Sequence, residues 1–333
     1  MDLFDNTPDR PQTTKKASGP RNWSYSRRSM LDQCPRAYYY QYYGSKKNTA
    51  EQEPRTEELR RLKQLSNRYL LAGDILHRVI GKHLEDLREG GGWSLEGMKS
   101  WAQDLFEESL AVSRSYEHGD PIPDDYHGPS LLLEYYYSVD DAESLCKDAK
   151  GRLMTALEHF ASGEEMNQLQ TGACHEKALI EESIHHEASG VTITGTVDLA
   201  YPDFEKDGGQ IHVVDWKLGG KRTGNESLQL LTYGMAVAER FDREVDRCLL
   251  HRARLAYEEV DSYEMTPRKA LQARCRILQD MDRMQMLDEH GRGAEREAFP
   301  ACQNPKVCAL CKFQKFCPGS PISNRDMLKI EVE

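Results

Sequence analysis

The sequence predicts an α+β or mixed α/β domain that carries a helical insertion. Two observations lead to this fold class. Before about residue 165, apolar residues recur at helical spacing, as in 73–89, where one stripe consists of Leu76, Ile80, Leu84 and Leu87. From residue 176 the spacing changes to two, which is typical of strands, and helical segments then alternate with strands. The chain of 333 residues can form one large domain, which we expect over 23–333.

The first part of the chain is expected to be helical after a short lead. Residues 1–22 lack the apolar core of a secretory signal, so we expect a disordered lead there. The sequence "GGGW" after residue 89 breaks the helical pattern. The expected helical segments are 24–43, which contains "CPRAYYYQYYG", the charged 55–72, 73–89, and most of 94–162 apart from a loop at 118–129.

The second part is expected to form a sheet with two further helices. "KALIEESIHHE" and "VTITGTVDLAY" have the alternation of a hairpin, and "GGQIHVVDWKLG" follows as a third strand. In the second of these strands, one predicted face consists of Val191, Ile193, Val197 and Leu199, and the other of Thr192, Thr194, Thr196 and Asp198. Two more strands, "CLLHRARLAY" and "DSYEMT", follow an amphipathic helix at 225–241. The last helix begins with Thr266 as its N-cap and Pro267 in its first turn.

Charge and hydropathy limit the classes of function. The net charge of −11 argues against a surface coated with basic residues for duplex DNA, although a local basic groove is compatible with it. There is no run of 18 apolar residues, so we expect no membrane span and a cytoplasmic protein. Short basic spots, which are either part of such a groove or solvated surface, occur at Arg27 and Arg28, Lys46 and Lys47, 60–63, and Lys221 and Arg222.

The strand "IHVVDWKLGG" carries an acid and a base two residues apart. Asp215 and Lys217 therefore share one face, and Trp216 points to the other, where it packs. Asp198 lies near the end of the neighbouring strand. Two carboxylates brought together repel each other unless a divalent cation such as Mg²⁺ or Mn²⁺ binds between them. Lys217 would then face a bound phosphate, which favours phosphodiester hydrolysis; the alternative is a salt-bridged strand end at the surface.

Five motifs in order resemble the PD-(D/E)XK nucleases of the RecB type. They are "GDILH", "GTVDLAY", "HVVDWKLGG", "LQLLTY", and a cysteine pattern with one cysteine in "CPRAYYY" and three in C-x2-C-x5-C near the end of the chain. This pattern is similar to that of the iron–sulfur RecB-like group, which includes the AddB nuclease domain, exonuclease V and CRISPR-associated RecB-like exonucleases. The resemblance covers roughly residues 24–43, 73–84, 178–241 and 302–318.

The resemblance implies a fold and a division of the chain. The fold is a restriction-endonuclease-like core in which helices flank a central mixed sheet. The nuclease core would span about 166–290 together with helix 73–89, and the helical insertion about 90–165. The iron–sulfur region would consist of 302–318 and Cys34.

The resemblance also implies roles for individual residues. His77, Asp198 and Asp215 would bind Mg²⁺ or Mn²⁺, assisted by the backbone carbonyl of Trp216. Asp198, Asp215 and Lys217 would form the catalytic set. Gln229 and Tyr233, one helical turn apart, would touch DNA or brace the site. A glutamate in the preceding strand also belongs to the family pattern, and the strand phase leaves open whether it is Glu181 or Glu182.

Four thiolates can hold either a 4Fe-4S cluster or zinc. The segment "CQNPKVCALCKFQKFC" contains Cys302, Cys308, Cys311 and Cys317, so a local set is one alternative. The family pattern favours a 4Fe-4S cluster held by Cys34 with Cys308, Cys311 and Cys317. Such a cluster would join the two ends of the chain and stabilise the fold. The nearby tyrosines could stack on bases, but their density predicts that most of them pack on protein.

The expected function is a metal-dependent DNA nuclease, an exonuclease acting on single strands or DNA ends in repair, recombination or phage defence. The sequence contains no G-x-x-x-x-G-K-[ST] motif, so unwinding would require a helicase or another protein partner. Two alternatives remain at this point. One is a non-catalytic iron–sulfur subunit that binds DNA or assists assembly, and the other is a zinc-stabilised protein without nuclease activity.

Overall fold

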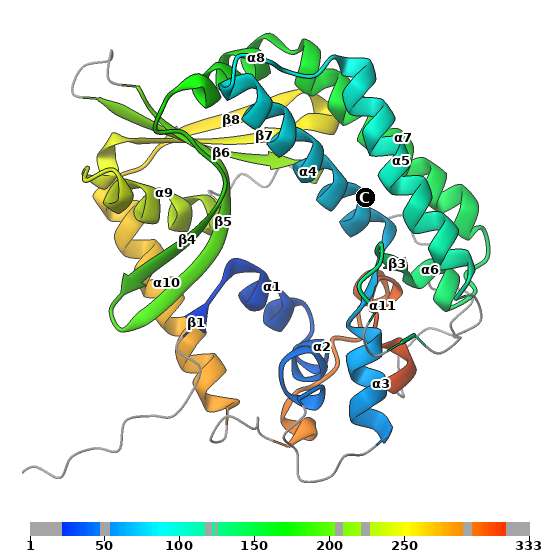
Figure 1. The fold of residues 1–333 in the computed structure, drawn as a ribbon. Helices are drawn as coiled ribbons and strands as arrows, with labels where there is room; N and C mark the ends of the chain where they lie inside the picture. Colours follow the sequence, from blue (N-terminus) through cyan, green and yellow to red (C-terminus); the bar gives the residue numbers. More distant parts are fainter. Residues whose placement is uncertain are drawn as a thin grey trace, which may run out of the picture.

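The structure of the protein is a computed structural model (Figure 1). Among the expected features, the lead before Asn22, Lys47, and the pair Lys221 and Arg222 lie outside the described residues. The structure describes residues 22–46, 54–116, 122–123, 126–203, 209–220, 227–288 and 295–317.

The predicted helical segment 24–43 is confirmed, with one interruption. Helix α1 (Tyr25–Gln33) ends at Cys34, whose backbone is extended, and α2 (Pro35–Tyr39) continues into a π-helical turn at Tyr40–Gly44. The interruption follows from Pro35, which disfavours the helical conformation in the residue before it.

The predicted charged helical segment 55–72 is confirmed in part, since residues 63–67 are not helical. Helix α3 (Pro54–Leu62) is separated from α4 (Arg68–Arg88) by strand β2 (Leu65–Ser66), which pairs in parallel with β3 (Leu131–Leu132). Asn67 starts α4, because its side chain accepts the backbone N–H groups of Tyr69 and Leu70. Helix α4 thus begins five residues before Gly73, where the pattern predicted it.

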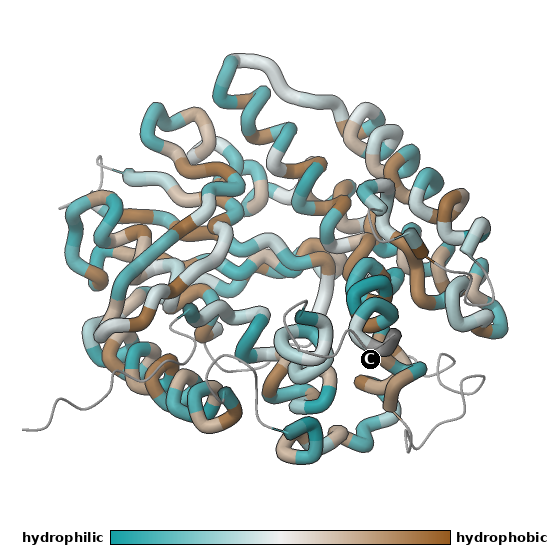
Figure 2. The backbone as a smooth tube through the Cα atoms, turned by 60° about the horizontal axis from the view of Figure 1, so that its bottom comes forward, coloured by the Kyte–Doolittle hydropathy of each residue, from teal (hydrophilic) through white to brown (hydrophobic). Residues whose placement is uncertain are grey.

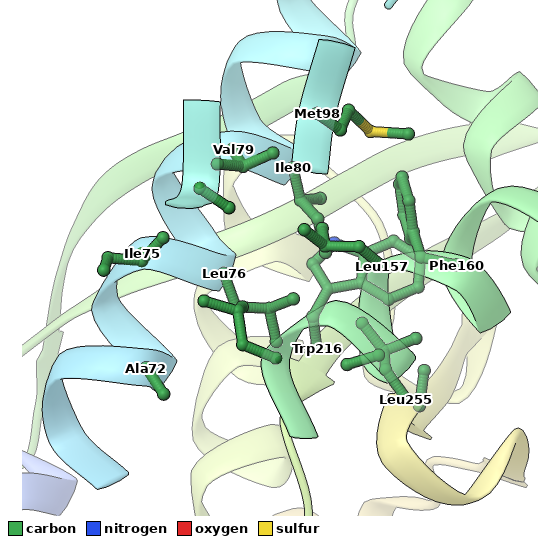
Figure 3. Close-up of a cluster of buried hydrophobic side chains, with 14 of the residues drawn as sticks. Ala72, Ile75, Leu76, Val79, Ile80, Met98, Leu157, Phe160, Trp216 and Leu255 are labelled. Carbon is green, nitrogen blue, oxygen red and sulfur yellow. The ribbon is translucent and has the colours of Figure 1, made fainter. Parts of the chain in front are cut away.

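The predicted helical region between α4 and the sheet is confirmed. It consists of α5 (Leu95–Arg114), α6 (Leu133–Tyr136), α7 (Ala142–Ser162) and α8 (Glu164–Thr171). With α4, these helices cover one face of the sheet through a buried apolar cluster. Figure 3 shows Trp216 in this cluster, and its indole ring lies 5.4 Å from the ring of Phe160, at an angle of 88°.

The sheet is mixed, in agreement with the predicted fold class. Its main path is β1–β5–β6–β7–β8, and β4 pairs with β5. Strands β4 and β5 form the predicted antiparallel hairpin, whereas β6 and β7 are parallel. The strands are β1 (Asn22–Trp23), β4 (Leu179–Ala188), β5 (Val191–Asp203), β6 (Gln210–Lys217), β7 (Cys248–Arg254) and β8 (Glu259–Glu264).

Helices α9 (Leu228–Arg240) and α10 (Pro267–Met286) cover the other face of the sheet. Thr266 caps α10 and Pro267 is its first residue, as predicted. Along these and the other helices, hydrophobic and hydrophilic residues alternate turn by turn (Figure 2). A last short helix, α11 (Pro305–Ala309), lies in the cysteine-rich segment. In the part of the chain that the structure describes, no helix combines the length and apolarity needed to cross a membrane.

The predicted face pattern of β5 holds only in part. Val191, Ile193 and Val197 pack in the cluster with α9 and α10, but Leu199 packs in the cluster with α4. The alternation is interrupted near Asp198. Opposite this position, Glu181 of β4 has a positive φ of 46° and falls between the paired residues.

Candidate active site

The candidate site lies where β5 loses its strand partners on one edge. Strand β1 pairs with residues 192–193 of β5, and β6 pairs with residues 199–203. The stretch 194–198 between them borders a pocket of about 960 Å³. The pocket is also lined by Ser24–Ser26 at the start of α1, by α4, by α5, and by residues 127–130. In Figure 1, α1, α4 and β5 lie around the same central region.

Asp198 is held at this opening by a backbone group of β6. Its Oδ2 accepts the N–H of Trp216 at 2.7 Å. Because Leu199 pairs with Val214, the register brings Asp198 next to the fully buried Asp215. Burial raises the pKa of Asp198 to about 7; the positive His77 opposes this shift and the negative Asp215 adds to it.

Lys217 stands beside the buried acid. Its Nζ lies 2.7 Å from Oδ1 of Asp215, and its side chain is about one-third exposed, at 33%. Burial alone would lower the pKa of Lys217, but the negative charges of Asp215 and Asp198 outweigh it and raise the pKa. The ammonium ion is thus kept charged at the edge of the pocket.

His77 of α4 meets the two acidic strands from the opposite wall. Its Nδ1 lies 3.4 Å from Glu181 Oε1 and 3.6 Å from Asp198 Oδ1. Burial lowers the pKa of His77, but its hydrogen bond to Glu181 and the nearby carboxylate charges reverse the effect and raise it to about 9. One ligand atom from each of these three residues lies within 4.8 Å of the others.

Glu181 is the acidic residue that the strand phase left undecided. Its carboxylate borders the pocket beside His77, whereas the side chain of Glu182 is exposed. Gly81, one helical turn after His77, makes room for it, because a Cβ there would lie 2.7 Å from Glu181 Cγ. A glycine four residues after the histidine in "GDILHRVIG" was the available signal for this close approach.

Gln229 and Tyr233 of α9 complete the wall next to Lys217. The Nε2 of Gln229 donates to the Tyr233 hydroxyl at 2.9 Å, and both residues line the pocket. The ring of Tyr233 packs directly over Gly195, since a Cβ at that position would lie 2.7 Å from Cε1 of the tyrosine. The two side chains thus contact each other at the wall of the pocket, and their predicted role in touching DNA or bracing the site stays a prediction.

Comparison with protein families assigns the chain. The family model described as the PD-(D/E)XK nuclease superfamily matches residues 22–318. The chain belongs to this superfamily. Membership implies a metal-dependent nuclease with DNA as its substrate. No curated protein matches the chain.

The donor set fits the divalent cation that PD-(D/E)XK nucleases use. Oδ2 of Asp215 is buried without a hydrogen-bond partner, and Oδ1 is paired only with the Lys217 ammonium. Buried oxygens are rarely left so, and a cation is one group that would satisfy them. Carboxylate oxygens with one imidazole suit Mg²⁺ or Mn²⁺. Trp216 is seen to contribute its N–H to Asp198, and the metal contact of its carbonyl stays a prediction.

The five cysteines considered as cluster ligands all line one small pocket between α2 and the end of the chain. They are Cys34, Cys302, Cys308, Cys311 and Cys317. Burial raises the pKa of the Cys311 thiol, and the neighbouring thiols add to the shift. Arg36 ties the two chain segments together by donating to the carbonyl of Phe299 at 2.6 Å. Cys34 and Cys302 thus both lie within reach of the last three cysteines.

The tyrosine run packs on protein around this pocket, as predicted for most of its members. Tyr38, Tyr40 and Tyr43 are buried. The hydroxyl of Tyr40 donates to the carbonyl of Phe316 at 2.5 Å, while its ring lies 5.6 Å from that of Phe313. Three of the five tyrosines are therefore unavailable for stacking on bases.

Proposed function

We propose that this PD-(D/E)XK protein is a deoxyribonuclease of the RecB-like iron–sulfur type that cleaves single-stranded DNA or DNA ends. One observation carries the catalytic part of the proposal. A buried Asp215, whose Oδ2 has no hydrogen-bond partner, pairs through Oδ1 with Lys217 at the edge of a pocket that Asp198, Glu181 and His77 also line.

The metal would be held by His77, Glu181, Asp198 and Asp215. When bound, it supplies Lewis-acid activation of water and of the scissile phosphate. Asp215 fixes the Lys217 ammonium by the 2.7 Å ion pair, so this positive charge is already in place before the substrate arrives. There it stabilises the negative charge that develops on the phosphate oxygens. Trp216 N–H keeps Asp198 in a single orientation.

The residues that line the pocket favour a single strand of DNA as the substrate. Residues of α1, α4, α5 and 127–130 surround the carboxylates, and the lining includes the hydroxyl groups of Ser24, Ser26, Thr194 and Thr196. Hydroxyl groups of this kind can donate to backbone phosphates without reading sequence. The net charge of −11 favours a strand held in such a local channel over a duplex bound on an open surface.

The gathering of five cysteines in one pocket supports a metal centre there. Four thiolates suit either zinc or a 4Fe-4S cluster, and the resemblance to the iron–sulfur RecB-like group favours the cluster. We assign the ligands as Cys34, Cys308, Cys311 and Cys317, with a structural role.

For the biological role, we propose a class of pathways. An exonuclease of this type would act in the cytoplasm in repair, recombination or phage defence, with unwinding supplied by a helicase or another protein partner. The alternative is a non-catalytic iron–sulfur subunit that binds DNA or assists assembly. Intact Asp198, Asp215 and Lys217 in an open pocket favour the enzyme.

The catalytic proposal is tested with end-labelled DNA. Single-stranded and double-stranded substrates, linear and circular, are incubated with Mg²⁺ or Mn²⁺. We expect cleavage of linear single strands, or of duplexes from their ends, and slow cleavage of circles. Absence of any cleavage, with DNA still bound, would support the non-catalytic subunit instead.

The cluster is tested by metal analysis of protein prepared without oxygen. We expect a brown protein containing iron and sulfide. Cys34→Ser should lose iron and stability, whereas the matched variant Cys302→Ser should keep both. The reverse result would assign the local cysteine set, and zinc without iron would overturn the cluster.

A further inference from the structure

A second pocket, of about 450 Å³, is lined in part by residues that directly follow Lys217 in the chain. Its walls are Tyr69 at the start of α4, Arg152 of α7, the residues after β6 from Leu218, and Tyr257 after β7. We call it the tyrosine pocket. None of these residues belongs to the proposed metal site or to the cysteine pocket.

Tyr257 presents an open aromatic surface. It is 55% exposed. The turn is held to the end of β6 because the N–H of Ala256 donates to the carbonyl of Leu218 at 2.8 Å. Gly219 leaves the ring uncovered on that side: a Cβ at this glycine would meet Cε2 of Tyr257 at 3.6 Å.

Tyr69 forms a second aromatic wall that is fixed from behind. The guanidinium of Arg68 lies 4.4 Å from its ring centroid and donates to its hydroxyl at 3.2 Å. Arg68 is itself buried and pairs with the buried Glu134 at 3.0 Å. The ring is therefore held in place before any ligand arrives, which reduces the entropy lost on binding.

The tyrosine pocket is continuous with the catalytic elements. Leu218 directly follows Lys217, and Tyr69 precedes His77 by eight residues on the same helix, about 12 Å along its axis. About three stacked nucleotides, at roughly 3.4 Å each, span this distance.

We propose that the tyrosine pocket binds an unpaired nucleobase of the strand being cut, up to about three nucleotides from the scissile phosphate. The inference rests on the proposed nuclease function. Flat aromatic faces stack on any base without reading its sequence, and Arg152 at the rim supplies a cation for the adjoining phosphate. This occupant accounts for the exposed aromatic surface and the positive charge together.

The test uses Tyr257→Ala with Tyr257→Phe as its matched control, since phenylalanine keeps the ring. A second variant, Gly219→Leu, fills the pocket while leaving Tyr257 in place; the backbone of Gly219 is outside the left-handed region, so leucine can adopt it. Leu271→Ala, at an equally exposed apolar position on α10, controls for the loss of surface apolar area.

Binding of a fluorescent single-stranded oligonucleotide is measured in EDTA, and cleavage is measured with Mn²⁺. We expect Tyr257→Ala and Gly219→Leu to weaken binding and raise KM on the order of tenfold, with kcat within about threefold, while Tyr257→Phe and Leu271→Ala match the wild type. A single abasic nucleotide near the cut should reproduce the effect in the wild type and add nothing in Tyr257→Ala.

Unchanged DNA binding in both Tyr257→Ala and Gly219→Leu would overturn the inference, and so would an equal loss at every abasic position. Because binding is measured without metal, a wild type that binds through Tyr257 but never cleaves would overturn the nuclease proposal and keep the base site.

Discussion

Each face of β6 carries its own set of polar residues, and the two sets differ in the partners that their buried polar atoms have. On the face toward α4, His212 bonds through Nδ1 to Nε2 of His251 at 2.9 Å, and Nδ1 of His251 bonds to the Ser262 hydroxyl at 2.8 Å. The two rings are coplanar within 1°, and Tyr201 stacks on His212 at 4.7 Å. The face toward α9 carries Asp215, whose buried Oδ2 has no hydrogen-bond partner and whose Oδ1 is paired only with Lys217.

The difference separates a structural network from a reactive group. A buried polar chain whose members bond to one another holds strands together and needs no ligand. A buried carboxylate beside a second carboxylate lowers the stability of the fold, and such pairs cluster at functional sites. The same strand thus uses one face for stability and the other for chemistry, and substitutions on the two faces should have different consequences.

The largest expected effect is on the α9 face. Lys217→Ala removes the ammonium ion that would stabilise the developing phosphate charge, so we expect the rate of cleavage to fall on the order of a hundredfold or more while metal and DNA still bind.

Asp215→Ala removes a proposed metal ligand and should weaken Mn²⁺ binding as well as abolish cleavage. Gel assays and calorimetry measure the two quantities.

Both variants should still fold, because Val214 and Trp216 on the packed face are unchanged. Wild-type cleavage by Lys217→Ala would mean that the pair with Asp215 is only a salt bridge, and the contrast between the two faces would disappear.

Much of the fold could be predicted, since hydrophobic spacing reports the elements that bury one face. The hairpin of β4 and β5 and the capped helix α10 were found in this way. The short strands β1 and β2 were missed because two residues carry no periodic signal and exist only through distant partners. The parallel pairing of β6 with β7 likewise depends on the crossover through α9.

The candidate site was predictable as a motif and not as an arrangement. Asp215 and Lys217 are two residues apart, and residues at this spacing on a strand point to the same face, so the sequence alone predicts that they lie together. The choice between Glu181 and Glu182 depended on a positive φ at residue 181 and on room above Gly81, and neither follows from strand phase. The convergence of Cys34 with the last cysteines is likewise a property of the folded chain.

The next effect concerns metal removal and pH. In the metal-free protein the pKa of Asp198 is raised from 3.8 to about 7 and that of His77 from 6.5 to about 9. Both groups therefore stabilise the fold most fully at a pH below the pKa that each has in the unfolded chain. This contribution is lost as pH rises through 7 and then 9. A cation must displace these protons, so its affinity should rise over the same interval.

We accordingly expect the increase in Tm produced by Mn²⁺ over EDTA to be larger at pH 9 than at pH 6. Thermal unfolding at both values measures it, with Asp198→Asn as the variant that should flatten the dependence. An increase in Tm that is independent of pH would show that the cation binds elsewhere.

A smaller effect is expected on the face toward α4. His212→Phe keeps a ring to stack on Tyr201 but leaves His251 Nε2 without the bond from His212. The expected loss of stability is about 1–3 kcal/mol, the cost of leaving a buried polar group unsatisfied. Denaturant unfolding measures this loss, and cleavage below the melting transition should be within about twofold of the wild type. A large loss of activity in a folded variant would show that both faces serve the chemistry.

The smallest effect is expected for Gln229→Ala. The substitution removes the 2.9 Å hydrogen bond to the Tyr233 hydroxyl, but the tyrosine ring stays packed over Gly195. One such bond at a partly buried site contributes about 0.5–1.5 kcal/mol, which corresponds to roughly a two- to tenfold change in rate. Initial rates on single-stranded DNA measure the loss, and Tyr233→Phe, which removes the same hydrogen bond and keeps the ring, should behave similarly. A loss as large as that of Lys217→Ala would mean that Gln229 contacts the substrate itself, because a brace for Tyr233 cannot account for more than the bond it makes.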